Sequence, residues 1–183
     1  MVAEIKATYP YCVKTPEHAP EWQGSRYWIR ILVKNEGHAR AEQVEVFLSS
    51  VTDEKTNELV RRFVPMNLQW SNSHKVYADG ISPDMSRLCD LAAISDPGHP
   101  QFEQGRPPEL SNDKQKTCLS LRLESVPART DWLPPGKYLF AIRIAASNCK
   151  PKDWKIHLHL TGLWERDEKE MLPHGIDVSA TAT

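Results

Sequence analysis

The chain has 183 residues, 40% of them hydrophobic, with a formal net charge of −1 and an isoelectric point near 6.7. This length suits one domain with a substantial core, and the near-neutral charge speaks against nucleic acid, whose binding needs a concentrated basic surface. No stretch approaches the roughly 18 apolar residues of a membrane span, and the first residues lack the apolar core of a signal peptide. A cytoplasmic location is therefore favoured, unless the chain is a fragment of a longer protein.

The amino-terminal part predicts an interrupted strand and then a loop. Residues 2–13 alternate loosely between apolar and polar positions, and Pro10 interrupts them, which is typical of an edge strand or a bulge. We expect residues 15–25, which include Trp22, to form a loop.

Residues 26–35 give the clearest predicted strand. One side of the two-residue repeat is fully apolar, and it consists of Tyr27, Ile29, Ile31 and Val33. The segment Asn35-Glu36-Gly37 then predicts a turn, because asparagine and glycine tolerate positive φ. A second strand of the same kind is predicted over residues 41–51.

The middle of the chain predicts short strands and one long loop. Residues 66–70 form a short alternating run, and residues 86–95 are apolar on both faces, as in a central strand covered on both sides. Residues 96–117 are the most polar region and show no periodicity, so we expect a long polar loop insertion there.

The last third predicts three more alternating strands, over residues 118–124, 137–146 and 154–161. Residues 173–183 are predicted to be a carboxy-terminal tail in which Ile176 and Val178 dock as a last strand. Eight to ten strands with hardly any helix predict an all-β fold, an immunoglobulin-like antiparallel β-sandwich forming a single domain over residues 1–172. A barrel is the alternative, although no regular repeat supports closure.

Two blocks of sequence resemble a known class of domain. The first is Val-Lys-Asn-Glu-Gly at residues 33–37 with the Val-x-Val strand that follows, and the second is Leu-Pro-Pro-Gly-Lys-Tyr at residues 133–138. Together they resemble bacterial and archaeal immunoglobulin-like modules, including the cell-adhesion-related type called CARDB. The resemblance implies an immunoglobulin-like fold within a larger bacterial or archaeal system.

His157 and His159 form the sharpest candidate for chemistry. Residues two apart on a strand project from the same face about 7 Å apart, so their imidazoles can share a metal ion. Such a site needs a third and usually a fourth ligand, and no matching acidic motif follows the pair. We therefore favour a solvated strand face, with a metal-dependent enzyme as an alternative, and we expect no cofactor.

The chain has six tryptophans, and four of them fall in or beside predicted loops: Trp22, Trp70, Trp132 and Trp154. Aromatic side chains at the rim of a sandwich can stack on sugars or anchor a protein partner. The alternative, which we favour, is that they fill the ends of the sandwich.

The four cysteines lie far apart with no Cys-x-x-Cys pair, at Cys12, Cys89, Cys118 and Cys149. Without an export signal, buried free thiols are favoured, while two disulfides in any of three connectivities stay open.

The sequence predicts a non-catalytic module for protein interaction or spacing rather than an enzyme. We expect contacts to a protein partner through an edge strand or the rim loops, chiefly residues 96–117. Carbohydrate binding through the rim tryptophans is the second hypothesis, and metal-dependent catalysis at His157 and His159 is the third.

Overall fold

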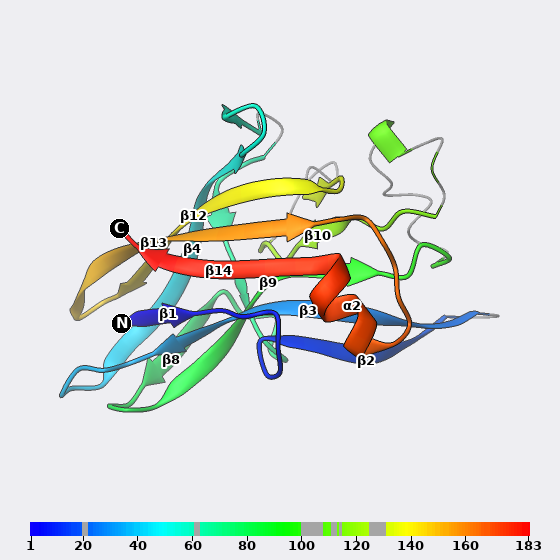
Figure 1. The fold of residues 1–183 in the computed structure, drawn as a ribbon. Helices are drawn as coiled ribbons and strands as arrows, with labels where there is room; N and C mark the ends of the chain where they lie inside the picture. Colours follow the sequence, from blue (N-terminus) through cyan, green and yellow to red (C-terminus); the bar gives the residue numbers. More distant parts are fainter. Residues whose placement is uncertain (20–21, 61–62, 100–107, 111–112, 114, 125–130) are drawn as a thin grey trace.

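The computed structural model describes residues 1–19, 22–60, 63–99, 108–110, 113, 115–124 and 131–183, apart from a few side chains. These residues form fourteen strands, ten of them three residues or longer, and one α-helix. The strands build two antiparallel sheets packed face to face (Figure 1). The predicted all-β antiparallel sandwich is thus confirmed, while half of the predicted loop at 96–117 lies outside the described residues.

The first sheet has the strand order β1-β3-β9-β10-β11, with β2 also paired to β3 and β7 also paired to β9. Its strands are β1 (Val2–Glu4), β2 (Cys12–Ala19), β3 (Trp22–Lys34), β7 (Gln69–Trp70), β9 (Ser86–Ser95), β10 (Leu119–Leu121) and β11 (Trp132–Leu133).

The second sheet has the order β14-β13-β12-β4-β5, and the strands β6 and β8 also pair with β4. Its strands are β4 (Ala41–Asp53), β5 (Glu58–Leu59), β6 (Met66–Asn67), β8 (Tyr77–Ile81), β12 (Gly136–Ala146), β13 (Cys149–Leu160) and β14 (Ile176–Ala182). Helix α2 (Glu168–Gly175) connects β13 to β14, and a short 3₁₀-helix spans Pro108–Leu110.

The chain changes sheets at Leu68. β6 pairs with β4 in the second sheet, whereas β7 pairs with β9 in the first, and the fully buried Leu68 lies between them. The sequence predicted one short strand here, because alternation alone does not show which partner each half takes.

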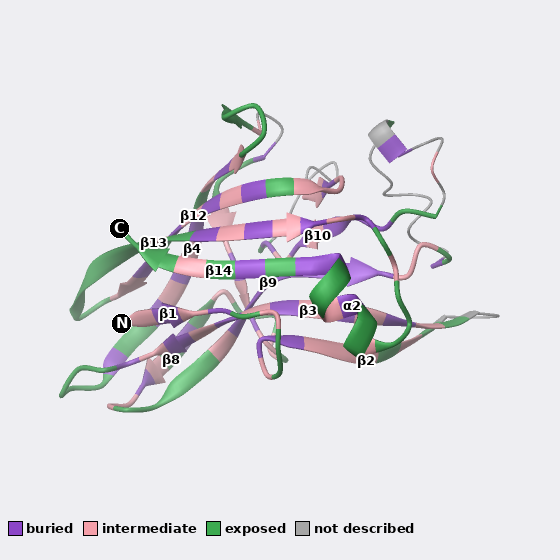
Figure 2. Cartoon of the chain, viewed as in Figure 1, coloured by how far each residue is buried: buried purple, intermediate pink, exposed green. Residues whose placement is uncertain are grey.

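The core lies between the sheets and is supplied by alternate residues of the long strands (Figure 2). On β3 the predicted apolar side is 0% exposed at all four positions, Tyr27, Ile29, Ile31 and Val33. Each such side chain contributes about 1.5–3 kcal/mol by leaving water. Strand β9 is buried from Cys89 to Ser95, as predicted for a central strand.

Asn35 organises the turn between β3 and β4. Its side-chain amide donates to the carbonyls of Ala39 and Ile81, at 2.8 and 2.9 Å, and its side-chain oxygen accepts from Gly37 N at 3.0 Å. Neither Asn35 nor Gly37 has positive φ. The predicted turn is therefore present, but it depends on hydrogen bonds of the asparagine side chain rather than on left-handed backbone.

Two predicted irregular segments are regular in the structure. The expected loop at residues 15–25 is the hairpin of β2 and β3, in which Pro16 pairs with Ser25 and His18 with Gln23. The expected tail begins inside helix α2 and continues as β14, which pairs with β13 along its length, so that Ile176 and Val178 dock in a last strand as predicted. In both places polar residues alternate on an exposed face, so hydrophobic periodicity gives little signal.

All four cysteines are free, and three of them, Cys12, Cys89 and Cys118, are buried as favoured, whereas Cys149 is exposed. Burial raises the pKa of Cys12 to about 12, which keeps this thiol protonated and unreactive. No helix in the described part of the chain is long and apolar enough to cross a membrane.

Candidate functional site

The end of the sandwich that carries α2 differs from the rest of the surface. Here the connection from β13 to α2 passes close to the β2–β3 hairpin and to the loop between β1 and β2 (Figure 1). Two hollows lie here, and the segment Arg166–Glu168 runs between them, because it contributes residues to both.

Tyr27 fixes this connection to β3. Its hydroxyl donates to the carbonyl of Glu165 at 3.0 Å, and its ring meets the Trp164 ring edge-on with centroids 5.2 Å apart. The Lys14 ammonium on β2 donates to the carbonyl of Arg166. The connection is therefore held by two side chains from the first sheet.

The surroundings of Tyr27 keep its hydroxyl neutral. Burial, followed by the negative charges of Glu168, Asp167 and Glu165, raises the pKa of Tyr27 from 10.0 to about 12. The hydroxyl thus remains a hydrogen-bond donor throughout the physiological range.

Helix α2 is anchored at both ends. Asp167 caps its start by accepting from Lys169 N at 3.0 Å, and Met171 is fully buried in the core. At its end, Thr161 N donates to the carbonyl of Gly175 at 3.0 Å. A Cβ on Gly175 would lie 2.6 Å from the Met171 sulfur, so a larger residue here would displace the end of the buried Met171 side chain. The helix therefore forms a fixed wall.

The first hollow, which we call the Tyr9 groove, has a volume of about 860 Å³ and runs between α2 and the β1–β2 loop. Tyr9 is 79% exposed, the largest exposure among the large hydrophobic residues described. The groove is lined by Ala7, Thr8, Tyr9, Asp167, Glu168, Lys169, Leu172, Pro173, Ile176 and Asp177. An exposed apolar surface of this kind is characteristic of a contact site.

The groove opens onto the start of β14, since Ile176 and Asp177 belong to both. Within the described residues β14 pairs with β13 alone, so its other edge presents backbone N–H and C=O groups without strand partners. β14 contains no proline and no lysine, and Asp177 is its one charged residue. The edge strand β2, in contrast, carries Lys14, Pro16 and Glu17.

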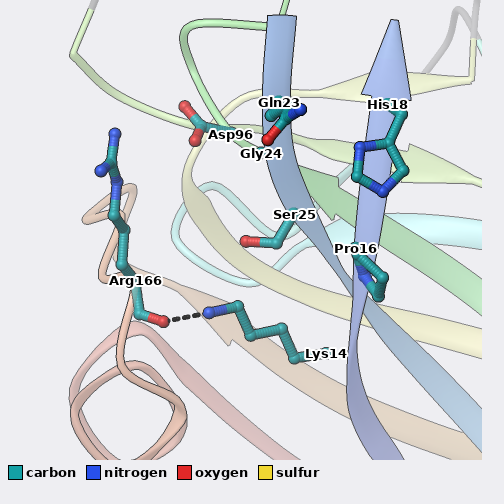
Figure 3. Close-up of a pocket in the computed structure, with 8 residues that line it drawn as sticks. All are labelled: Lys14, Pro16, His18, Gln23, Gly24, Ser25, Asp96 and Arg166. Atoms are coloured by element: carbon teal, nitrogen blue, oxygen red, sulfur yellow. Dashed lines mark hydrogen bonds between the residues drawn. The ribbon is translucent and has the colours of Figure 1, made fainter.

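The second hollow, which we call the polar pocket, has a volume of about 470 Å³ and lies between the β2–β3 hairpin and Arg166. Figure 3 shows Arg166 and His18 on opposite sides of it, with Ser25 between them. It is lined by Lys14, Pro16, His18, Gln23, Gly24, Ser25, Asp96 and Arg166. Neither hollow was predicted from the sequence.

The predicted rim tryptophans do not form an exposed platform. Trp70 is 2% exposed and belongs to the core, which corrects its assignment as a sugar-stacking or partner-binding residue. Trp154 is partly buried against the same core, and Trp132 packs on the small cluster of Leu110 and Cys118. The side chain of Trp22 lies outside the described part. Trp70 and Trp154 thus pack on the main core, in line with the favoured alternative, whereas Trp132 packs outside it.

His157 and His159 share the outer face of β13, as predicted, and both are half-buried. His157 Nδ1 lies 2.5 Å from a carboxylate oxygen of Glu54, while His159 lines a separate hollow of about 740 Å³ beside Lys137. In the described part of the chain, no group of three or more His, Cys, Asp or Glu side chains is placed to hold a metal ion. The structure thus adds no third ligand to the pair.

Trp28 forms a separate polar cluster on the outer face of the first sheet. The guanidinium groups of Arg26, Arg30 and Arg122 lie 5.6, 5.7 and 5.1 Å from its ring centroid. Arg26 pairs with Glu17 at 2.6 Å, and burial lowers its pKa. None of the hollows described above is lined by these four side chains, so the cluster acts in packing the face of the sheet.

Comparison with known proteins gives no relative, since no family model, no curated protein and no solved structure matches the chain. The function of the α2 end is therefore inferred from its own geometry.

Proposed function

We propose that this chain is a non-catalytic binding module that holds an extended segment of a partner protein in the Tyr9 groove. The observation that carries the proposal is the continuity of this groove with the free edge of β14. An apolar anchor site and unpaired strand backbone therefore lie side by side on one surface.

Strand addition is the binding mode that such a surface favours. An extended peptide can satisfy the free N–H and C=O groups of β14 with its own backbone, which gives affinity with little dependence on sequence. A large apolar side chain of the peptide can then enter the groove and pack on Tyr9 and Leu172, which gives specificity.

The charge of the groove indicates which charge the partner segment should carry. Asp167, Glu168 and Asp177 line it together with a single cation, Lys169. Among the described residues, neither Glu168 nor Asp177 has an ion-pair partner. A partner segment with a basic residue next to its apolar anchor would therefore be the best match.

The resemblance to bacterial and archaeal immunoglobulin-like modules of the CARDB type supports the same proposal. Modules of this kind would serve as interaction or spacer domains in a larger system. The partly buried tryptophans give carbohydrate binding no comparable support.

The test uses a displayed library of random peptides selected on the immobilised full chain. We expect enrichment of peptides with an aromatic or large aliphatic residue near Lys or Arg. The Tyr9→Ala variant should bind an enriched peptide at least about tenfold more weakly, the size of an anchor-residue loss.

Tyr77→Ala is the matched control, since Tyr77 is 54% exposed and lies on β8, away from α2. Its affinity should stay within about twofold of the parent chain. Equal weakening by the two substitutions, or no enriched peptide at all, would overturn the proposal.

A further inference from the structure

The polar pocket gathers side chains whose hydrogen-bonding capacity is unused. Within the described part of the chain, the guanidinium of Arg166, the imidazole of His18, the amide of Gln23 and the hydroxyl of Ser25 have no hydrogen-bond or ion-pair partner. Ser25 is only 7% exposed. A buried hydroxyl normally has a hydrogen-bond partner, so the pocket is suited to a ligand that supplies this partner.

Other arginines of the chain pair with a carboxylate, whereas Arg166 does not do so within the described residues. Arg30 contacts Asp90 at 3.1 Å and Arg143 contacts Asp153 at 2.7 Å, each through a carboxylate oxygen. The acid in the polar pocket is Asp96, and one of its oxygens accepts from Gly98 N at 2.9 Å. Two cationic side chains, Lys14 and Arg166, therefore face a single carboxylate.

The donors are held by regular structure. His18 and Gln23 are opposite one another in the β2–β3 pairing, and Pro16 is opposite Ser25. Arg166 is fixed at its backbone carbonyl by Lys14 (Figure 3). Binding would cost little reorganisation of the backbone, because these contacts already exist in the free chain.

We propose that the polar pocket binds an oxyanion group, a carboxylate or a phosphate, between Arg166 and His18. The planar guanidinium offers two parallel N–H donors that match either group. Ser25 and Gln23 donate to the remaining oxygens, and the free oxygen of Asp96 accepts from a hydroxyl or amine next to the anion. The ligand is thus an anion that carries a neighbouring hydrogen-bond donor.

This site is independent of the Tyr9 groove. The two hollows share no residue, and the segment Arg166–Glu168 separates them. Loss of one binding activity therefore leaves the other measurable.

The test is a ¹H–¹⁵N NMR titration of the full chain with sodium phosphate, and separately with sodium acetate, at constant ionic strength. We expect saturable shifts of the Ser25 backbone amide and the Gln23 side-chain amide. A shift with phosphate alone identifies phosphate-bearing ligands, a shift with acetate alone identifies carboxylates, and either result supports the site.

The decisive variant is Arg166→Gln, which should weaken anion binding at least about tenfold, since hydrogen bonds to charged groups are the strong ones. Its thermal midpoint should match the parent chain, which shows that the pocket and not the fold is affected. Arg40→Gln is the control, because Arg40 is exposed in the β3–β4 turn at the other end of the sandwich. Absence of saturable shifts, or equal weakening by both substitutions, would overturn the proposal.

Discussion

The two ends of the sandwich differ in whether their polar side chains are hydrogen-bonded within the fold. At the β3–β4 end, Asn35 is 3% exposed and its side chain makes three hydrogen bonds, one of them to Ile81 on β8. At the α2 end, Arg166 and Ser25 line an open pocket and Tyr9 stands 79% exposed beside a free strand edge. At the first end the polar side chain is satisfied within the fold, and at the second polar and aromatic side chains are open to a ligand.

This difference separates residues that stabilise the fold from residues that bind. Asn35 joins the end of β3 in one sheet to β8 in the other, so its amide ties the two layers together. Tyr9, at the α2 end, is not among the hydrophobic residues that pack against the core. Substitution of the buried Asn35 should therefore change stability, and substitution of the exposed Tyr9 should change binding.

The largest expected effect is that of Asn35→Ala. Its loss leaves the carbonyl of the buried Ile81 without its donor and removes the bond to Ala39, so we expect the free energy of unfolding to fall by about 3 kcal/mol. Urea unfolding followed by tryptophan fluorescence measures this change.

Asn148→Ala provides the matched control at the same end. The Asn148 side chain accepts from Glu42 N and from the Cys149 thiol and donates to the Arg40 carbonyl, but it is exposed. Water can replace its bonds, so the loss should stay below about 1 kcal/mol. Equal losses of unfolding free energy for the two substitutions would contradict the distinction between a buried and an exposed asparagine.

A smaller effect is expected for Tyr27→Phe at the α2 end. The substitution removes the hydrogen bond to the Glu165 carbonyl and should lower the free energy of unfolding by about 1 kcal/mol at neutral pH. Tyr77→Phe, at an exposed position, should leave stability unchanged.

The same variant has a characteristic pH dependence. Because the pKa of Tyr27 rises from 10.0 to about 12 on folding, the unfolded chain releases this proton first as the pH increases. The parent chain should therefore lose stability between about pH 10 and pH 12, and the Phe variant lacks this contribution. The stability difference between the two should shrink over that window, whereas a constant difference would show that Tyr27 titrates normally.

Much of the fold was predictable because it depends on local periodicity. The alternation of Tyr27, Ile29, Ile31 and Val33 places the inner face of β3 correctly, and the buried run in β9 marks a central strand. The Asn-Glu-Gly turn was also predicted, although its hydrogen bonds to residues as distant as Ile81 were not.

The α2 end could not be predicted in this way, because it forms from segments far apart in the chain. The Tyr9 groove combines residues 7–9 with residues 167–177, and the polar pocket combines the β2–β3 hairpin with Asp96 and Arg166. The second part of the groove lies partly in the segment expected to be a tail, residues 173–183. Periodicity gives no measure of such long-range neighbours.

Residue type alone does not show whether a tryptophan near a turn is buried or exposed. Trp70 ends a predicted short strand beside a turn, and β7 pairs with β9 and turns its indole into the core. A large aromatic near a turn is as well suited to filling the end of a sandwich as to binding a sugar. Tyr9, in contrast, falls in the interrupted strand predicted over residues 2–13, and its side chain is 79% exposed.

Amide hydrogen exchange of the full chain, with and without a selected peptide, tests the central claim most directly. If the peptide adds to the free edge of β14, the amides of Ile176–Ala182 and of residues 7–9 should exchange more slowly, while those of β8 stay unchanged. Protection at β8 or around Asn35, with β14 unaffected, would contradict the assignment of the α2 end as the binding end.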